Sequence, residues 1–380
     1  MGRPGGVDRL SPSKGDLGCP PREGDGGGHP PPSGDVGHDP PPGDVGHDPP
    51  SGDVVVLAGG TGGAKLARGM LDVVGPERLA VIANTGDDIE IYGAHVSPDP
   101  DLVSFWLADL IDDRGWGLAG DTFNVMDGLR ALGAEVWFNL GDRDLAWCME
   151  RARLTGVQVA DARAGAARPA APQAADAGSS PSERSLSPTA ALARLNAAIG
   201  VEARVLPMSD EPVHTWIQSG GRWRPFQEFM IRERAAGPVE GVQLRGIERA
   251  RPTPEVLAAL AGARAIAIGP SNPLISIDPI LAVPGMRDAL CAAPAPIVAV
   301  SPIVGGEVLK GPTAAFMAHA GRELSAAGVV EHYGELLDGI VADEAVPGVP
   351  ALRTDTRMGD ADARAGLATR VLAFADSLRP

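Results

Sequence analysis

The sequence predicts an α/β fold, with a mostly parallel sheet, helices on both faces of it and a smaller insertion subdomain. Short apolar runs rich in β-branched residues are typical of strands that are buried on both faces. Each run ends in a turn rich in Gly, Ser, Asn or Asp, as in open sheets that bind ligands at the carboxyl ends of their strands. These runs lie at 54–57, 79–83, 265–268 and 296–300. Their order and turns indicate a Rossmann-like core.

Composition limits the classes of partner. The 380-residue chain has a formal net charge of −16 at pH 7, which disfavours nucleic acid or an anionic membrane as partner. No apolar run approaches the roughly 20 residues of a membrane span, and the N-terminal residues lack the apolar segment of an export signal. We therefore expect a cytoplasmic protein with small-molecule partners. A phosphorylated ligand would need helix ends, basic side chains or a metal ion to offset the negative field.

The chain divides into five segments by composition. Two of them hold too few large apolar residues for a core and are predicted to be disordered. A helix and a hairpin are predicted between the two parts of the core, with hairpin strands at 204–208 and 212–218, because apolar and polar residues alternate there. The segments are a Gly/Pro/Asp-rich tail (1–52), the first part of the core (53–155), a disordered insert (156–186), the helix and hairpin subdomain (187–250) and the rest of the core (251–380).

The first strand leads into four glycines within five residues. Glycines let the backbone turn sharply and approach a ligand, and the free N–H groups of the following helix attract an anion. Lys65 replaces the third glycine of the dinucleotide fingerprint, and Leu66 replaces the Ser or Thr of the P-loop, so neither motif is complete. We expect phosphate binding, with an ordinary strand-to-helix turn as the alternative. The residues assigned to this site are Gly59, Gly60, Thr61, Gly62, Gly63 and Lys65.

Acidic residues follow the second predicted strand. Asp87 and Asp88 stand at its carboxyl end, where open α/β sheets bind ligands, and Asp101 precedes an apolar helix at 102–111. Carboxylates close together need a positive partner, and Mg²⁺ takes oxygen ligands and bridges carboxylates to phosphates. We therefore predict a Mg²⁺ site formed by Asp87 and Asp101. The alternatives are a turn shaped by Asn, Gly and Asp and, for Asp101, a helix cap.

Other predicted strands also end in residues suited to a ligand. Trp137 and Phe138 are predicted to close a third strand. They would either belong to the core, as aromatic residues at a strand end usually do, or wall a pocket for a flat ring, with Asn139 and Arg143 as polar contacts. Hydroxyl and N–H groups after the two later strands are predicted to hold the base, ribose or phosphate of a nucleotide. These groups belong to turns that contain Ser271, Asn272 and Ser301.

Seven blocks of sequence resemble the 2-phospho-L-lactate transferase family of coenzyme F420 biosynthesis, whose bacterial members are also described as phosphoenolpyruvate transferases. The blocks are AGGTGGAKLARGM, NTGDD, VSPDPDLV, RGWGLAGDTFN, LGDRDLA, IGPSNPLISIDPIL and SPIVGGEVLKGP, in this order. The resemblance implies a Rossmann-like core with an insertion subdomain. It also implies transfer of a phospholactyl or enolpyruvyl-phosphate group from a guanosine diphosphate conjugate to the terminal hydroxyl of the deazaflavin Fo, with release of GMP and with magnesium present.

The resemblance assigns roles to individual residues. It places the family's metal and Fo-site acids at Asp87 and Asp101, and the guanosine diphosphate part at the glycine turn and around Ser271 and Asn272. Asp87 or Asp88 is expected to orient or deprotonate the Fo hydroxyl. A basic Fo contact of archaeal relatives is replaced here by Asn139. A homodimer is expected only because symmetric dimers are common.

Two other functions compete with this one. Non-catalytic nucleotide-sugar-binding regulators that look like gluconeogenesis factors share the first turn and the acidic pair. They continue that pair into a Gly- and Ser-rich run, whereas Ile89 and Glu90 follow it here. A nucleotide-dependent oxidoreductase would need the third glycine and an acid at the tip of the second strand. The transferase is therefore the preferred interpretation, with the regulator as its alternative, and the group that the donor carries stays open.

Overall fold

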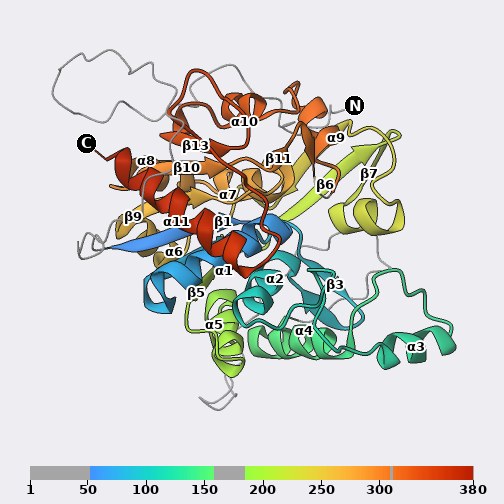
Figure 1. Cartoon of the computed structure of the whole chain (residues 1–380). Coiled ribbons are helices and arrows are strands. Elements are labelled where there is room, and N and C mark those ends of the chain that lie inside the picture. Colours follow the sequence, from blue (N-terminus) through green and yellow to red (C-terminus); the bar gives the residue numbers. More distant parts are fainter. Residues whose placement is uncertain (1–51, 158–184, 309–310, 380) are drawn as a thin grey trace.

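The protein is described by a computed structural model that covers residues 52–157, 185–308 and 311–379 (Figure 1). Nearly all of the tail and of the insert that were predicted to be disordered lies outside these residues, and the segment boundaries stay predictions. Within the described ranges, no helix combines the length and the apolar character that a membrane span needs.

The centre of the molecule is a seven-stranded sheet in which every neighbouring pair of strands is parallel. Its spatial order is β14-β13-β10-β9-β1-β2-β5, so β1 lies near the middle. The strands are β1 (Asp53–Ala58), β2 (Leu79–Ala83), β5 (Arg204–Pro207), β9 (Ala263–Ile268), β10 (Ile297–Val300), β13 (Gly339–Ala342) and β14 (Ala351–Arg353). The predicted α/β fold is confirmed.

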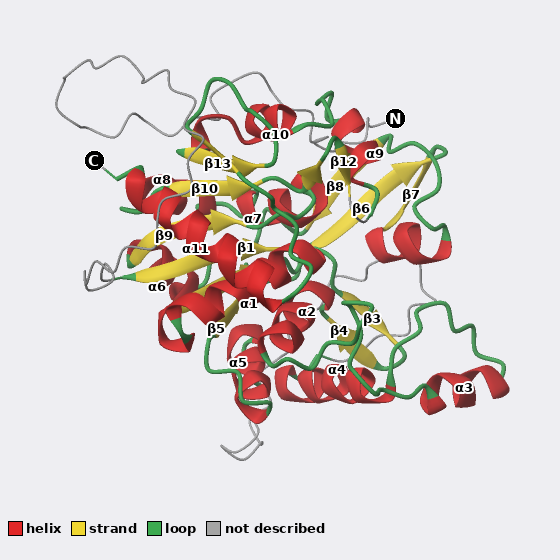
Figure 2. Ribbon diagram, viewed as in Figure 1, coloured by secondary structure: helices red, strands yellow, loops and turns green. Residues whose placement is uncertain are grey.

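Helices cover both faces of this sheet (Figure 2). Residues of β1 alternate between the two resulting cores: Val54 and Val56 pack with α1, α2, α4, α5 and α11, whereas Val55 and Leu57 pack with α6 to α10. A strand buried on both sides must be apolar throughout, which explains its continuous run. The helices are α1 (Gly60–Val74), α2 (Pro98–Leu107), α3 (Asn124–Ala131), α4 (Asp142–Thr155), α5 (Pro188–Ala198), α6 (Pro254–Ala261), α7 (Asp278–Leu281), α8 (Met286–Ala292), α9 (Thr313–His319), α10 (Ala326–Tyr333) and α11 (Ala361–Ser377).

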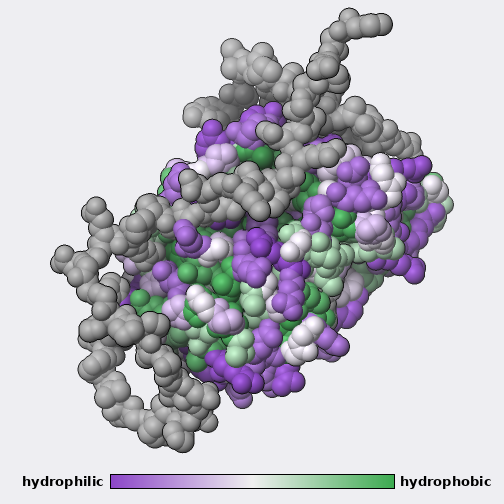
Figure 3. Space-filling view, turned by 90° about the horizontal axis from the view of Figure 1, so that it is seen from above, coloured by the Kyte–Doolittle hydropathy of each residue, from purple (hydrophilic) through white to green (hydrophobic). Residues whose placement is uncertain are grey.

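Small antiparallel sheets surround the core and form the insertions. They are β3 (Ile89–Ile91) with β4 (Ala94–Val96), β6 (His214–Ser219) with β7 (Arg222–Pro225) and β8 (Gly241–Arg245), and β11 (Ile303–Val304) with β12 (Glu307–Val308). Short helical turns complete the described structure: η1 (Pro76–Arg78), η3 (Glu228–Arg232), η4 (Pro273–Ile277) and η5 (Gly334–Leu336). On the face drawn in Figure 3, hydrophilic residues predominate toward the rim and hydrophobic residues gather between them.

Two predicted strand assignments are wrong. Segment 204–208 does not pair with 212–218 in a hairpin, because β5 runs parallel to β2 at the edge of the main sheet, while β6 pairs with β7 and β8. Residues Trp137 and Phe138 form no strand. Their backbone N–H groups donate to Tyr92 Oη at 3.0 and 3.1 Å, and the place beside β2 is taken by β5.

Candidate active site

A cavity of about 640 Å³ lies where β1, β2, β9 and β10 end. Its volume falls within the range of roughly 300–1,000 Å³ that is usual for small-molecule sites. The structure brings most of the predicted ligand-binding residues together in its wall. These lining residues are Gly59, Gly60, Thr61, Gly62, Lys65, Asp87, Ser271, Asn272 and Ser301. Gly63 is not among them, since it is buried behind the turn and its N–H donates to Ser271 Oγ at 3.1 Å.

The glycine turn uses part of its donor capacity inside the protein. Helix α1 begins at Gly60, and the Gly60 N–H donates to Asp99 Oδ1 at 2.6 Å. Lys65, the one basic residue among the described lining residues of this cavity, donates to Met358 O at 3.2 Å, and its Nζ lies 5.7 Å from the centre of the Trp106 ring. A ligand phosphate would therefore meet the N–H groups that follow Gly60 and the Lys65 ammonium.

The turn also packs tightly against the loop after β9. A Cβ atom on Gly62 would lie 1.9 Å from Pro270 O, which is backbone and has little room to move. Replacing Gly62 by Ala is expected to lower the free energy of unfolding by about 2 kcal/mol or more and to weaken binding of any ligand held by the turn. Urea unfolding measures the first effect.

The matched control for this substitution is Gly128→Ala in α3. A Cβ there meets nothing within 4 Å, so the control is expected to be neutral or to stabilise by up to about 1 kcal/mol through helix propensity. Equal stability of the Gly62→Ala variant and the wild type would contradict the tight packing described for the turn.

Two buried carboxylates face the larger cavity. Asp87 is 7% exposed, and its Oδ1 has no hydrogen-bond partner among the described residues. Burial, together with the charge of Asp99, raises the pKa of Asp87 well above its ordinary value. Burial likewise raises the pKa of Asp99 to about 6, although Asn84 Nδ2 donates to Asp99 Oδ2 at 2.9 Å. Two like charges in one buried place favour a bound cation or proton, so the pair fits a metal site.

Asp88 points to a different set of partners. Ser97 Oγ donates to its Oδ1 at 2.7 Å, and His95 Nε2 lies 3.1 Å from its Oδ2. Asp88 is not among the lining residues of the larger cavity or of the smaller one described below. Its predicted catalytic role stays a prediction that no contact with either cavity supports.

The titration of His95 is expected to make the stability of the folded protein depend on pH. Burial alone would lower the pKa of His95, but the carboxylates of Asp88 and Glu90 outweigh burial and raise it from 6.5 to about 9. A folded-state pKa above the unfolded value means that the stabilisation is fully present below pH 6.5 and is lost as the pH rises through 9. The free energy of unfolding is expected to fall by up to about 3 kcal/mol across that window.

Urea unfolding at several pH values tests this expectation. A His95→Gln variant is expected to remove most of the decline because the neutral amide does not titrate. Parallel pH profiles for the variant and the wild type would show that His95 is not responsible.

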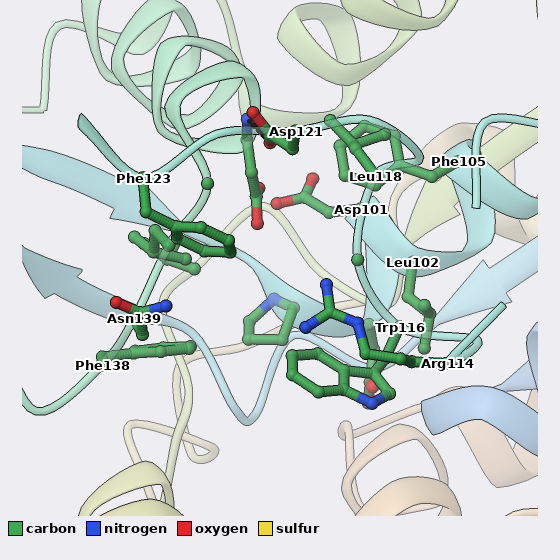
Figure 4. A pocket seen from close by; sticks show the side chains of 17 residues that line it. Asp101, Leu102, Phe105, Arg114, Trp116, Leu118, Asp121, Phe123, Phe138 and Asn139 are labelled. Carbon is green, nitrogen blue, oxygen red and sulfur yellow. Dashed lines mark hydrogen bonds between the residues drawn. The ribbon is translucent and has the colours of Figure 1, made fainter. Parts of the chain in front are cut away.

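A smaller cavity of about 210 Å³, drawn in Figure 4, shares lining residues with the first one. Pro98, Asp99 and Trp116 line both cavities. As predicted, Phe138 and Asn139 line the smaller cavity, whereas Trp137 and Arg143 are not among its lining residues. Four carboxylates and a single guanidinium also line it. They belong to Asp99, Asp101, Asp121, Asp144 and Arg114.

Asp101 lies at the smaller cavity, apart from Asp87. Both of its carboxylate oxygens are hydrogen-bonded: Trp147 Nε1 donates to Oδ1 at 2.8 Å, Arg151 Nη1 donates to Oδ2 at 3.0 Å, and Arg151 Nη2 also pairs with Oδ1. Asp101 and Arg151 are both buried. The predicted Mg²⁺ pair of Asp87 and Asp101 thus lines two adjoining cavities, and the acid that shares the larger cavity with Asp87 is Asp99.

A second group of possible metal ligands lies beside Asp101. Ligand atoms of Asp101, Asp144 and Cys148 are all within 4.8 Å of one another, so this group could hold a metal ion. A thiol suits softer metals than Mg²⁺, which prefers oxygen ligands. Burial and the neighbouring Asp101 and Asp121 raise the pKa of Asp144 to about 7. For Mg²⁺, the carboxylates of the larger cavity are the better match.

The sequence predictions missed Asp99. It stands in the same VSPDPDLV block as Asp101, two residues before it, and it lines the larger cavity together with Asp87, whereas Asp101 lines the smaller one. The buried contacts of Asp101 come from α4, about fifty positions later, and no spacing rule connects them. A usable sequence signal is that apolar residues flank both Asp99 and Asp101. This pattern indicates that the first turn of α2 is buried and that both carboxylates lie inside the protein.

Comparisons with known proteins show the family to which the chain belongs. The family model described as 2-phospho-L-lactate transferase CofD matches residues 54–368. A phosphoenolpyruvate transferase from Kitasatospora aureofaciens is 38% identical over 343 residues, which cover 86% of this chain and 98% of the relative. A 2-phospho-L-lactate transferase from Methanosarcina mazei is 37% identical over 292 residues, which cover 77% of this chain and 87% of the relative.

Among solved structures, protein BH3568 from Bacillus halodurans matches with a TM-score of 0.51 and 18% identity, covering 85% of this chain and 100% of that one. At that identity the likeness concerns the fold alone. The family match and the relatives confirm the resemblance seen in the seven sequence blocks. The chain therefore belongs to the 2-phospho-L-lactate transferase CofD family and is a lactyl- or enolpyruvyl-phosphate transferase of coenzyme F420 biosynthesis.

Proposed function

We propose that this transferase moves a lactyl or enolpyruvyl phosphate group from a guanosine diphosphate conjugate to the terminal hydroxyl of Fo and releases GMP. The observation that carries the proposal is the pair of adjoining cavities, which share Pro98, Asp99 and Trp116 as a common wall. One ligand in each cavity would bring a hydroxyl group and a diphosphate together at that wall.

The larger cavity suits the donor. The N-terminal end of α1 and Lys65 supply positive potential for a diphosphate, and the hydroxyl groups of Ser271 and Ser301 stand at the ends of neighbouring strands. The volume of about 640 Å³ matches a nucleotide conjugate better than the 210 Å³ of its neighbour does. We therefore assign the guanosine diphosphate part to this cavity.

The smaller cavity suits the acceptor. Four carboxylates line it, so a diphosphate would meet like charges there, whereas Fo carries no phosphate. The ring of Phe138 provides a flat apolar wall for the deazaflavin, and Asn139 offers an amide beside it. The ribityl chain of Fo would extend toward Asp99, and its terminal hydroxyl would reach the donor there.

The residues of the larger cavity fit a Mg²⁺ ion. The unpaired, buried Asp87 Oδ1 is one suitable ligand, and either Asp101, as predicted, or Asp99, which shares the cavity, provides the second carboxylate. A Mg²⁺ ion held there would neutralise charge on the phosphoryl group and on the leaving GMP.

The chain's own residues carry the remaining steps. The Fo hydroxyl oxygen forms the new bond to phosphorus, and the bond between that phosphorus and the oxygen of GMP breaks. Asp87 would accept the hydroxyl proton, since its carboxylate faces the donor cavity. Lys65 and the amides of the glycine turn hold the departing phosphate in place.

Incubation of the protein with Fo, Mg²⁺ and each of the lactyl, enolpyruvyl and glyceryl donors, followed by mass spectrometry, tests this function. We expect Fo that carries the transferred lactyl, enolpyruvyl or glyceryl phosphate group, together with GMP, from one donor, and no product when Mg²⁺ is chelated. Binding of a donor without any product would favour the non-catalytic regulator. The proposed homodimer is tested separately by light scattering of the purified protein.

A Mg²⁺ titration of turnover identifies the second carboxylate. If Asp99 completes the site, Asp99→Asn raises the Mg²⁺ concentration at half-maximal rate, whereas Asp101→Asn changes it little. The reverse order would support the pair predicted from the sequence.

A further inference from the structure

Trp116 occupies an unusual place in the molecule. Its side chain is 58% exposed, yet it lines both cavities, and it is the aromatic member of the wall that they share. Large aromatic side chains are usually buried, because leaving them in water forgoes a large hydrophobic gain. An exposed indole at the junction of two ligand cavities therefore needs a reason.

The loop that carries Trp116 is held in place by its own hydrogen bonds. Asp112 N donates to Gly117 O at 2.8 Å, and the Asp112 carboxylate accepts from Arg114 N at 3.0 Å. Trp106 Nε1 donates to Gly115 O at 3.3 Å and ties the tip of the loop to α2. The indole is thus positioned before any ligand arrives, which lowers the entropy cost of binding.

Arg114 fixes the indole from one side. Its guanidinium lies 4.4 Å from the centre of the Trp116 ring, and its Nε donates to Asp112 Oδ2 at 2.6 Å. Figure 4 shows Arg114 against Trp116 on one side of the smaller cavity, and Phe123, Phe138 and Asn139 on the other. The cavity is therefore bordered by flat groups on two sides.

We propose that Trp116 is a positioning residue for the acceptor, whose ring system binds between the Arg114–Trp116 stack and Phe138. This inference rests on the proposed function, because it takes the smaller cavity as the Fo site. Stacking on a planar cation and an aromatic ring recognises a flat conjugated ligand without reading its edges. The Arg114–Trp116 stack also keeps the deazaflavin ring of Fo out of the donor cavity. Only the flexible ribityl group of Fo, with its terminal hydroxyl, can then cross the shared wall.

Steady-state kinetics of Trp116→Ala and Trp116→Phe test the role. Loss of a stacking contact is expected to raise the KM for Fo roughly 10- to 100-fold in Trp116→Ala. The Phe variant keeps a ring and is expected to recover most of that loss. The KM for the guanylyl donor is expected to rise much less than the KM for Fo, because Trp116 borders the donor cavity only at the wall that the two cavities share.

The matched control is Trp216→Ala. Trp216 also stacks on an arginine, with Arg245 at 3.5 Å from its ring centre, but it lies on β6 and lines neither cavity. Its loss is expected to leave both KM values unchanged. Quenching of tryptophan fluorescence by Fo provides a readout without turnover: Trp116→Phe is expected to lose much of the quenching, and Trp216→Phe is expected to retain it.

Two results would overturn the proposal. In the first, Trp116→Ala binds Fo as tightly as the wild type does. In the second, the same variant raises the KM for the donor and not that for Fo, which would place the guanine base on the indole. Failure of the proposed function is recognised separately, because the wild type would then form no product with any donor, whereas the Fo titration by fluorescence would still report on Trp116.

Discussion

Replacing Asp87 by Asn is expected to lower kcat by roughly 10²- to 10⁴-fold while Fo still binds. The substitution keeps the size of the side chain but removes the negative charge and the proton acceptor. Asp87 and Asp99 both line the larger cavity, but only Asp87 has a buried carboxylate oxygen without a hydrogen-bond partner among the described residues. Single-turnover formation of the Fo phosphodiester product, measured with saturating donor, isolates the chemical step from product release.

Asp88→Asn is the matched comparison for this experiment. Asp88 contacts Ser97 and His95 and lines neither cavity, so its loss is expected to reduce stability more than turnover. Near-normal turnover of Asp87→Asn would reject the role of Asp87. A larger loss in Asp88→Asn would transfer the role to that residue, as the sequence alternative allows.

Replacing Arg151 by Met is expected to destabilise the protein by about 3–5 kcal/mol. The substitution leaves the Asp101 carboxylate buried without its cation, and the exposed fraction of both residues is only 4%. A buried ion pair contributes little more stability than a well-packed apolar pair in its place. Removing only one of the two charged residues is costly, because the other charge then stays buried without a partner. Denaturant unfolding of the purified variant gives the change in free energy.

The double variant Arg151→Met with Asp101→Asn distinguishes the charge from the packing. Removing both charges is expected to recover part of the lost stability, which appears as a coupling free energy in a double-mutant cycle. Additive effects of the two substitutions would mean that the hydrogen-bonded ion pair contributes nothing specific. The Cys148 thiol beside Asp101 is a second neighbour of the carboxylate and is left unchanged in both variants.

The sequence predicted the strands that are buried on both faces. Continuous apolar runs such as 79–83 have no polar face to present to water, so a central parallel strand was the only suitable place for them. Strand β5 was assigned to a hairpin because alternation is equally typical of an edge strand in a parallel sheet and of a hairpin. The strand with which β5 pairs depends on which strand edge the rest of the fold leaves free. The local sequence pattern holds no information about that edge.

At the candidate site, too, the sequence predicted what topology determines and missed what tertiary contacts determine. Residues at strand ends, such as Ser271 and Ser301, were predicted because the topology alone brings the carboxyl ends of parallel strands to one edge. Asp99 and Trp116 were missed as cavity residues because they lie on a helix start and a loop whose orientation is set by tertiary contacts. Residue type and spacing identified their blocks but not the direction in which each side chain points.

The wall shared by the two cavities has a stereochemical consequence. In the proposed reaction, a hydroxyl group in the smaller cavity would attack the phosphorus atom in the larger one without an intervening carrier, across the described residues that line both cavities, Pro98, Asp99 and Trp116. Such a direct attack would pass through a ternary complex and would invert the configuration at phosphorus. A relay through a protein nucleophile would need two displacements and would preserve the original handedness of a chirally labelled phosphate.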